Sequence, residues 1–328
     1  MTSREGMGVY VTRTLPEPGT TLMQRAGLGV DQHESDRPPS RAELVEHVEG
    51  KQGLLCMLTE RVDAELLDAA PTLRVVANLA VGYDNVDVEA ATERGVVVTN
   101  TPDVLSEATA DLTWALILAA CRRLGEGDRL VRSGEWEGWS PTQLLGSSVH
   151  ASTIGIIGMG KIGRAVARRA RGFGMTVLYH NRRPDPVAES VLTAEFVGLD
   201  RLLHDADIVT IHTPLTVATR HLIDSRALSR MRSSAVLVNT ARGPIVDEAA
   251  LVDALRAGAI AAAGLDVFER EPALASGLAE LPNVTLAPHI GSATVDARSA
   301  MVRLCSENII AVLAGDRPLT AVNPEVGV

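Results

Sequence analysis

The chain has 328 residues, of which 46% are hydrophobic and 22% charged, a length and composition typical of a globular protein with two domains of ordinary size. Its 31 basic and 41 acidic residues give a formal net charge of −10, which disfavours nucleic acids and anionic membranes as partners. The first residues lack the apolar core of a signal peptide, and no apolar stretch approaches the roughly 20 residues of a membrane span, so we expect a soluble, cytoplasmic protein that acts on small molecules.

Strand-like and helix-like segments alternate over the first part of the chain. We predict strands at residues 9–12, 53–58, 74–78 and 96–99, with helices at 41–48 and 63–70. This alternation is typical of a parallel sheet covered by helices. The segment is therefore expected to form one small α/β unit.

A long helix is predicted over residues 106–120, because Ser106, Glu107 and Asp111 suit the positive N-terminal end of a helix. A polar connection that carries Trp139 then leads to a new strand at residue 153. From there the alternation restarts, and six buried strands are predicted at residues 153–157, 176–179, 208–212, 235–239, 262–265 and 285–287. Their apolar character indicates a doubly wound parallel sheet.

A final helix, predicted over residues 296–313, has no place in that sheet because six strands already complete it. We therefore predict that this helix returns to the first domain. The expected fold is α/β with two domains: a doubly wound Rossmann dinucleotide-binding domain, residues 102–294, is inserted into a smaller flavodoxin-like substrate domain, residues 1–101 and 295–328.

The three cysteines, Cys56, Cys121 and Cys305, are remote from one another in sequence and belong to no Cys/His cluster. Such residues are usually inert buried thiols. We expect neither a disulfide nor a metal site.

A glycine-rich turn lies between the strand at residues 153–157 and the helix that follows it, in the segment TIGIIGMGKIG at residues 153–163. Gly158 permits a tight turn, Gly160 lets the backbone approach a pyrophosphate, and Gly163 allows the helix to pack on the strand. The N-terminus of that helix then receives the negative charge. This context predicts a dinucleotide site.

The residues after the next strand indicate which dinucleotide is bound. An NAD site usually carries an acid about 20 residues after the glycines, yet no Asp or Glu occurs between Gly163 and Asp185. Asn181, Arg182 and Arg183 stand there instead, and guanidinium groups can pair with a 2′-phosphate. We predict that NADP(H) is preferred and NAD(H) possible; the alternative is that both arginines only coat the surface.

Arg242, Glu271 and His289 each follow a predicted strand of the second sheet, so they should reach the carboxyl edge where open α/β folds bind ligands. Histidine can transfer a proton near neutral pH, a carboxylate can favour its charged form, and arginine can bind a carboxylate. Singly, each could be an ordinary loop, core or surface residue. Together with the dinucleotide site, they predict hydride transfer to a small 2-oxo acid.

The chain resembles the D-isomer-specific 2-hydroxyacid dehydrogenases, and most closely their glyoxylate/hydroxypyruvate reductase branch. The matching motifs occur in family order at residues 78–87, 107–111, 155–163, 212–216, 239–243, 264–272 and 288–294.

This resemblance implies that His289 is the proton donor, that Glu271 is its partner and that Arg242 orients the substrate in a cleft between the domains. The other expected substrate-binding residues are Val81 and Gly82, through their amides, and Leu58, Trp139 and Ser292. The expected cofactor-binding residues are Thr109, Gly158, Met159, Gly160, Lys161, Ile162, Gly163, Asn181, Arg182, Arg183, Thr213, Pro214, Thr240, Ala241, Asp266, His289 and Gly291, with Thr109 at the phosphates and Asp266 at the nicotinamide carboxamide.

The predicted function is the NADPH-dependent reduction of glyoxylate or hydroxypyruvate to the D-2-hydroxy acid. A D-lactate or broad-specificity D-2-hydroxyacid dehydrogenase is the main alternative, and a dinucleotide-sensing corepressor is an alternative of a different class. The family also implies a homodimer. In it Trp139 either reaches the partner subunit's site or only packs in the interface.

Overall fold

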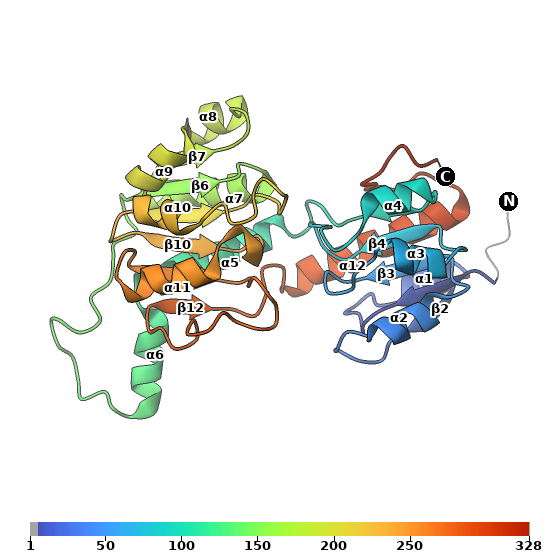
Figure 1. Cartoon of the computed structure of the whole chain (residues 1–328), viewed down its shortest axis with the longest axis horizontal. Coiled ribbons are helices and arrows are strands. Elements are labelled where there is room, and N and C mark those ends of the chain that lie inside the picture. The colour runs from blue at the N-terminus through green and yellow to red at the C-terminus, as the bar shows by residue number, and fades with distance from the viewer. Residues whose placement is uncertain (1–5, 328) are drawn as a thin grey trace. The chain divides into compact units, whose positions relative to one another are not determined.

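The computed structural model describes residues 6–327, which form two compact units (Figure 1). The first unit comprises the described residues up to Leu105 together with those from Ala293 onwards, and the second comprises Ser106–Ser292. The chain therefore leaves the first unit, builds the second and returns. The α/β fold with two parallel sheets is confirmed.

The first unit contains a five-stranded parallel sheet in the order β2-β1-β3-β4-β5, the flavodoxin-like order. Its strands are β1 (Gly8–Val11), β2 (Gly29–Gln32), β3 (Gly53–Cys56), β4 (Val75–Asn78) and β5 (Val97–Thr99). Its helices are α1 (Thr21–Arg25), α2 (Arg41–Val48), α3 (Ala64–Ala69), α4 (Val88–Glu93) and α12 (Val295–Ala314). The edge strand β2 was not predicted, because its sequence GVDQ is half polar and it lacks buried residues.

Side chains define where these helices begin. Ser40 closes a capping box with Glu43 at the start of α2, while Asp63 and Asp87 cap α3 and α4. The apolar faces of these three helices cover one side of the sheet. On the other side α12 packs against β3 and β4.

The C-terminal segment after α12 covers the edge of β5. The helix ends at Gly315, which is left-handed with φ 83°. Beyond it, Ala321 bridges Thr99 in the antiparallel direction. The buried Asn323 side chain accepts a hydrogen bond from the Val98 N–H at 2.8 Å and donates one to the Val96 carbonyl at 3.0 Å. Main-chain groups that an edge strand would leave unpaired are thereby satisfied.

The second unit contains a seven-stranded parallel sheet in the order β12-β11-β10-β9-β6-β7-β8. Its strands are β6 (Thr153–Ile157), β7 (Thr176–His180), β8 (Glu195–Phe196), β9 (Ile208–Ile211), β10 (Val236–Asn239), β11 (Ala262–Leu265) and β12 (Val284–Leu286). The prediction of six strands is wrong by one: the two-residue β8 at the edge is too short to leave a pattern in the sequence.

Helices cover both faces of this sheet, with α5 and α7 on one face and α9, α10 and α11 on the other (Figure 1). The helices are α5 (Ser106–Cys121), α6 (Leu124–Ser133), α7 (Lys161–Ala170), α8 (Pro186–Leu192), α9 (Leu199–Asp205), α10 (Ser225–Arg230) and α11 (Glu248–Arg256), with 3-10 turns at Arg171–Phe173 and Gly243–Ile245. We predicted a polar connection where α6 stands. That expectation is wrong for residues 124–133, because α6 has only three large apolar side chains and buries none of its residues.

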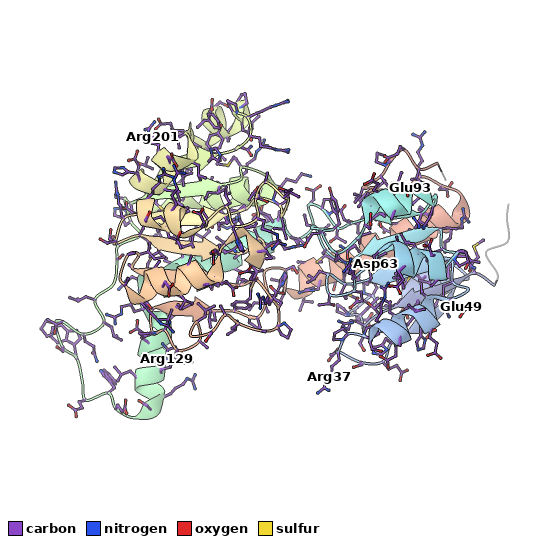
Figure 2. All side chains as sticks on the ribbon, viewed as in Figure 1. Arg37, Glu49, Asp63, Glu93, Arg129 and Arg201 are labelled. Carbon is purple, nitrogen blue, oxygen red and sulfur yellow. The ribbon has the colours of Figure 1, made fainter. Side chains whose placement is uncertain are left out.

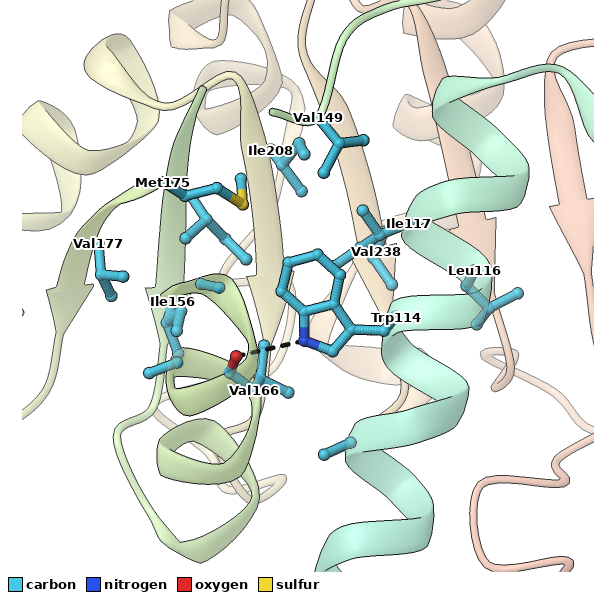
Figure 3. Packing of buried hydrophobic residues seen from close by; sticks show 14 of the residues in the cluster. Trp114, Leu116, Ile117, Val149, Ile156, Val166, Met175, Val177, Ile208 and Val238 are labelled. Atoms are coloured by element: carbon cyan, nitrogen blue, oxygen red, sulfur yellow. Dashed lines mark hydrogen bonds between the residues drawn. The ribbon is translucent and has the colours of Figure 1, made fainter. Parts of the chain in front are cut away.

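Trp114 anchors α5 to α7 in the core of the second unit (Figure 3). Its indole N–H donates to the Val166 carbonyl at 3.2 Å, and its ring stacks on Phe173 with centroids 4.6 Å apart. Charged side chains such as Arg129 and Arg201 lie on the outside (Figure 2). The three cysteines are buried, as predicted. Among residues 6–327, no helix combines the length and apolar character needed to cross a membrane.

Candidate active site

The glycine-rich turn connects β6 to α7 where the strand order of the second sheet reverses, between β9 and β7. Gly158 is left-handed with φ 98°, and a Cβ on it would lie 2.6 Å from the carbonyl oxygen of His212. A Cβ on Gly163 would overlap the Gly158 carbonyl, whereas one on Gly160 would meet nothing within 4 Å. Gly158 and Gly163 thus allow close packing, and Gly160 leaves open space at the N-terminus of α7.

The other residues predicted around this turn differ in exposure. Met159 is buried, Ile162 is half-buried and Lys161 is exposed. Thr213 and Pro214 follow β9, and the backbone nitrogen of Thr213 would lie 2.7 Å from a Cβ on Gly158. The structure therefore places the loop after β9 directly beside the glycine-rich turn. The open space at Gly160 and the N-terminus of α7 fit the pyrophosphate of a dinucleotide.

The segment after β7 offers arginines and no free acid. Arg182 and Arg183 are exposed, and within residues 6–327 neither forms an ion pair or side-chain hydrogen bond. Asp185, the first acid after the glycines, is 8% exposed, pairs with Arg164 and caps α8 through the amides of Val187 and Ala188. Burial opposes ionisation of Asp185, but these hydrogen bonds lower its pKa overall. The Asp185 carboxylate thus already has partners within the protein, in Arg164 and the first turn of α8.

The loop after β10 is shaped by the buried Asn239. Its Nδ2 donates to the Arg242 carbonyl at 2.9 Å, and its Oδ1 accepts from the Ala241 N–H at 3.0 Å. A Cβ on Gly243 would overlap the backbone of Phe268, so the loop after β11 lies against this one. Neither Asn239 nor Gly243 was predicted to have a role. An asparagine at the end of a buried strand was the available signal.

His289 and Glu271 form the predicted pair. Nδ1 of His289 lies 2.8 Å from Oε2 of Glu271, while Oε1 of Glu271 accepts from the Phe268 N–H at 2.9 Å. Although burial acts to raise it, the pKa of Glu271 is lowered by the hydrogen bond to His289 and by the charge of nearby Arg242. The structure therefore brings together the three residues that the sequence analysis selected.

Asp266 holds the backbone of the histidine loop. Its two carboxylate oxygens accept from the amides of Ile290 at 2.7 Å and Gly291 at 2.8 Å, and its carbonyl accepts from the His289 N–H at 2.8 Å. Asp266 is 1% exposed, and burial raises its pKa. This clamp supports a left-handed His289, with φ 54°. The contact of Asp266 with a nicotinamide carboxamide stays a prediction.

Glu248, at the start of α11, is a further support that the sequence analysis did not select. The side chain is buried, and Oε1 accepts from the Glu269 N–H at 2.6 Å. Burial raises the pKa of Glu248. Glu269 in turn lies 2.8 Å from Nε2 of His221. The loop that carries Glu271 is thus held through Glu269, which contacts both Glu248 of α11 and His221.

Thr109, Thr240 and Gly291, all predicted to bind the cofactor, gather near the N-terminal part of α5. The Thr113 hydroxyl is 2.9 Å from that of Thr240 and donates to the Thr109 carbonyl at 2.8 Å. A Cβ on Gly291 would lie 3.6 Å from the Thr109 hydroxyl. Ser292 is half-buried immediately beyond. These positions come together at the carboxyl edge of the second sheet.

Two predicted substrate-binding segments belong to the first unit. Val81 and Gly82 form a half-buried turn soon after β4, and Leu58 is half-buried after β3. Asn85 joins the two loops by donating to the Met57 carbonyl at 3.0 Å and contacting Asn78 at 3.3 Å. Trp139, beyond α6, is 83% exposed. Its predicted contact with substrate stays a prediction.

Comparison with known proteins shows the family to which the chain belongs. Residues 114–291 match the model of the D-isomer specific 2-hydroxyacid dehydrogenase NAD-binding domain. A glyoxylate reductase from Thermococcus onnurineus is 52% identical over 322 residues, which cover 97% of this chain and 96% of that protein.

Solved structures extend the match across the fold. The TT0316 protein from Thermus thermophilus superposes with a TM-score of 0.91 at 48% identity and covers 96% of this chain and 100% of that one. An NADPH-dependent glyoxylate/hydroxypyruvate reductase from Sinorhizobium meliloti, in complex with NADP and malonate, gives a TM-score of 0.84 at 36% identity with 98% of each chain covered. The resemblance seen in the sequence motifs is confirmed, and the chain belongs to the D-isomer specific 2-hydroxyacid dehydrogenases, as a nicotinamide dinucleotide-dependent oxidoreductase.

Proposed function

We propose that the protein reduces glyoxylate or hydroxypyruvate to the D-2-hydroxy acid, with NADPH as cofactor and His289 as proton donor. The observation that carries the proposal is the 2.8 Å contact between His289 Nδ1 and Glu271 Oε2 beside Arg242. Because Nδ1 faces the carboxylate, Nε2 is the ring nitrogen available to a substrate oxygen. When bound, the nicotinamide supplies the hydride.

The residues of the chain then have distinct tasks in this proposal. Arg242 binds carboxylate and carbonyl oxygens of the substrate, and the Val81 and Gly82 amides bind its carboxylate. His289 delivers a proton from Nε2 to the carbonyl oxygen as negative charge develops there. Glu271 stabilises the protonated ring and fixes its orientation. A charged ring is productive for reduction, so the rate should fall as pH rises.

Relatives support the choice of substrate. The similar proteins from Thermococcus onnurineus and Sinorhizobium meliloti are named as glyoxylate and glyoxylate/hydroxypyruvate reductases. The test is a set of initial rates with NADPH and then NADH, each against glyoxylate, hydroxypyruvate and pyruvate. The highest kcat/KM for NADPH with glyoxylate or hydroxypyruvate is expected. A preference for pyruvate would instead indicate a D-lactate dehydrogenase, and no turnover with any of them would contradict the proposal.

The preference for NADPH rests on Arg182 and Arg183, which have no protein partner among residues 6–327, and on Asp185, whose carboxylate is engaged by Arg164. Replacing both arginines by alanine should lower kcat/KM for NADPH about tenfold or more, because charge-assisted hydrogen bonds to a phosphate are lost. The value for NADH should change little. Arg226→Ala is the control, because Arg226 is also exposed but lies on α10, away from the segment after β7. Equal losses with both cofactors would contradict this assignment.

We further propose a homodimer formed through α6 and the loop after it. Large apolar side chains are exposed there: Leu124, Val131, Trp136, Trp139 and Leu145. A patch of this kind, with tryptophans, is typical of a protein interface. Sedimentation should show a dimer that Trp139→Ser weakens. A monomeric wild type would contradict the proposal.

A further inference from the structure

In the turn at Val81 and Gly82, the backbone carbonyl groups accept hydrogen bonds from the rest of the first unit. Three successive carbonyls each accept one hydrogen bond: Ala80 from the Thr101 N–H at 2.9 Å, Val81 from Asn100 Nδ2 at 2.8 Å, and Gly82 from Asn78 Nδ2 at 2.9 Å. In contrast, within the described chain the N–H groups of Val81 and Gly82 donate to no acceptor. The turn thus has one satisfied side and one side of free donors.

The bonded carbonyls and the free N–H groups of this turn belong to the same peptide units. A peptide unit is planar and trans, so its C=O and N–H point in opposite directions. The Val81 carbonyl shares its peptide unit with the Gly82 N–H, and the Ala80 carbonyl shares one with the Val81 N–H. A hydrogen bond that fixes each carbonyl therefore also fixes the direction of the free N–H. It also polarises the peptide unit, which makes the N–H a stronger donor.

Asn100 is itself held from the far end of the chain. Its carbonyl accepts a hydrogen bond from the Thr320 hydroxyl at 2.7 Å. That hydroxyl accepts from Nδ2 of Asn308 on α12 at 2.8 Å, and Oδ1 of Asn308 accepts from the Leu319 N–H at 2.8 Å. Asn308 is fully buried. A continuous chain of hydrogen bonds therefore runs from α12 through Thr320 and Asn100 to Val81.

We propose that Asn100 is a positioning residue for the substrate carboxylate and that Thr320 and Asn308 keep it in place. The proposal rests on the proposed function, in which the Val81 and Gly82 amides bind that carboxylate. Asn100 acts on the opposite side of the peptide and need not touch the substrate. Its amide is neutral, so it orients the donors without adding charge beside a bound anion. The C-terminal segment is then part of the substrate-binding apparatus of the first unit.

Paired substitutions test this chain of contacts. Asn100→Ala should raise KM for glyoxylate roughly tenfold, because a hydrogen bond from an oriented donor to a charged group is weakened. KM for NADPH and kcat should change little. Thr320→Val, which loses the hydroxyl, should raise KM for glyoxylate about threefold, whereas Thr320→Ser should match the wild type. Asn323→Ala is the control for general loosening: it should lower thermal stability and leave KM unchanged.

Binding of oxalate separates this proposal from the proposed function. Oxalate is a carboxylate close to glyoxylate in size that cannot be reduced, and calorimetry with the NADPH-loaded protein needs no turnover. We expect weaker oxalate binding in Asn100→Ala and Thr320→Val than in Thr320→Ser and the wild type. Equal affinity in all four proteins, or none in the wild type, would overturn the positioning role. A wild type that binds oxalate but reduces no 2-oxo acid would overturn only the proposed function.

Discussion

The histidine loop of the second unit and the turn at Val81 and Gly82 of the first unit are held by opposite kinds of side chain. Carboxylates hold the first: Asp266 binds the amides of Ile290 and Gly291, and Glu271 contacts His289. Neutral amides hold the second, through Asn78 and Asn100.

The contrast follows from the charge that each loop handles in the proposed reaction. A residue that delivers a proton gains from a neighbouring negative charge, which favours its protonated form. Donors that bind a carboxylate would lose affinity beside such a charge. The two supports should therefore respond differently when charge is added or removed.

The largest effect is expected for His289→Asn, which removes the proton donor and keeps a polar side chain. General acid catalysis contributes about 10²- to 10⁴-fold, so kcat should fall by that factor. NADPH affinity, measured by fluorescence titration, should be nearly unchanged. His204→Asn is a matched control, since His204 also lies 2.8 Å from an acid, Asp205, but on the surface of α9. Retained turnover in His289→Asn would refute the assignment.

Asn78→Asp would place a carboxylate at the end of β4, beside the turn that is held by amides. Asn78 is fully buried and donates to the Gly82 carbonyl. At neutral pH we expect a loss of at least about 2 kcal/mol in unfolding free energy, because a buried charge replaces a donor. Burial would raise the folded-state pKa of the new acid, so the loss should shrink as pH falls and the protonated acid can donate again.

The measurement is urea unfolding at several pH values, together with KM for glyoxylate, which should rise. Asn283→Asp removes a 3.0 Å hydrogen bond to the Ala261 carbonyl in the second unit and should leave KM unchanged. A loss of stability that did not depend on pH would weaken the comparison.

Glu271→Gln removes charge from the loop that is held by carboxylates. The reductive rate of the variant should begin to fall at a lower pH than that of the wild type, because the protonated ring loses its anionic partner. Full pH–rate profiles of kcat for both proteins measure this. Profiles that coincide would show that the carboxylate orients the ring without influencing its charge.

The smallest effect concerns acid stability. The pKa of Glu271 is lowered in the folded protein, so its stabilising contribution is present above the usual carboxyl pKa and is lost as pH falls through the folded value. The side chain is 28% exposed, and we expect less than about 1 kcal/mol. Unfolding of the wild type and Glu271→Gln should differ at pH 7 and converge in acid. A constant difference would contradict the linkage.

Much of this protein was predictable from local sequence. Buried strands such as β6 and β11 leave apolar runs, and the glycines at 158, 160 and 163 follow from the turn they must build. Arg242, Glu271 and His289 could be selected because chemistry at the carboxyl ends of parallel strands is a general rule. The family resemblance drew on the same local motifs.

Tertiary structure alone decided the remainder. The edge strand β8 is too short to leave a pattern in the sequence, and the helix α6 buries none of its residues. Asp185 pairs with Arg164 and caps α8, and these contacts form only when the chain is folded. The contacts between Val81, Asn100, Thr320 and Asn308 join residues as much as 220 positions apart. Hydrogen bonds of that kind leave no periodicity in a sequence, because their partners meet only when the C-terminal segment has packed against β5.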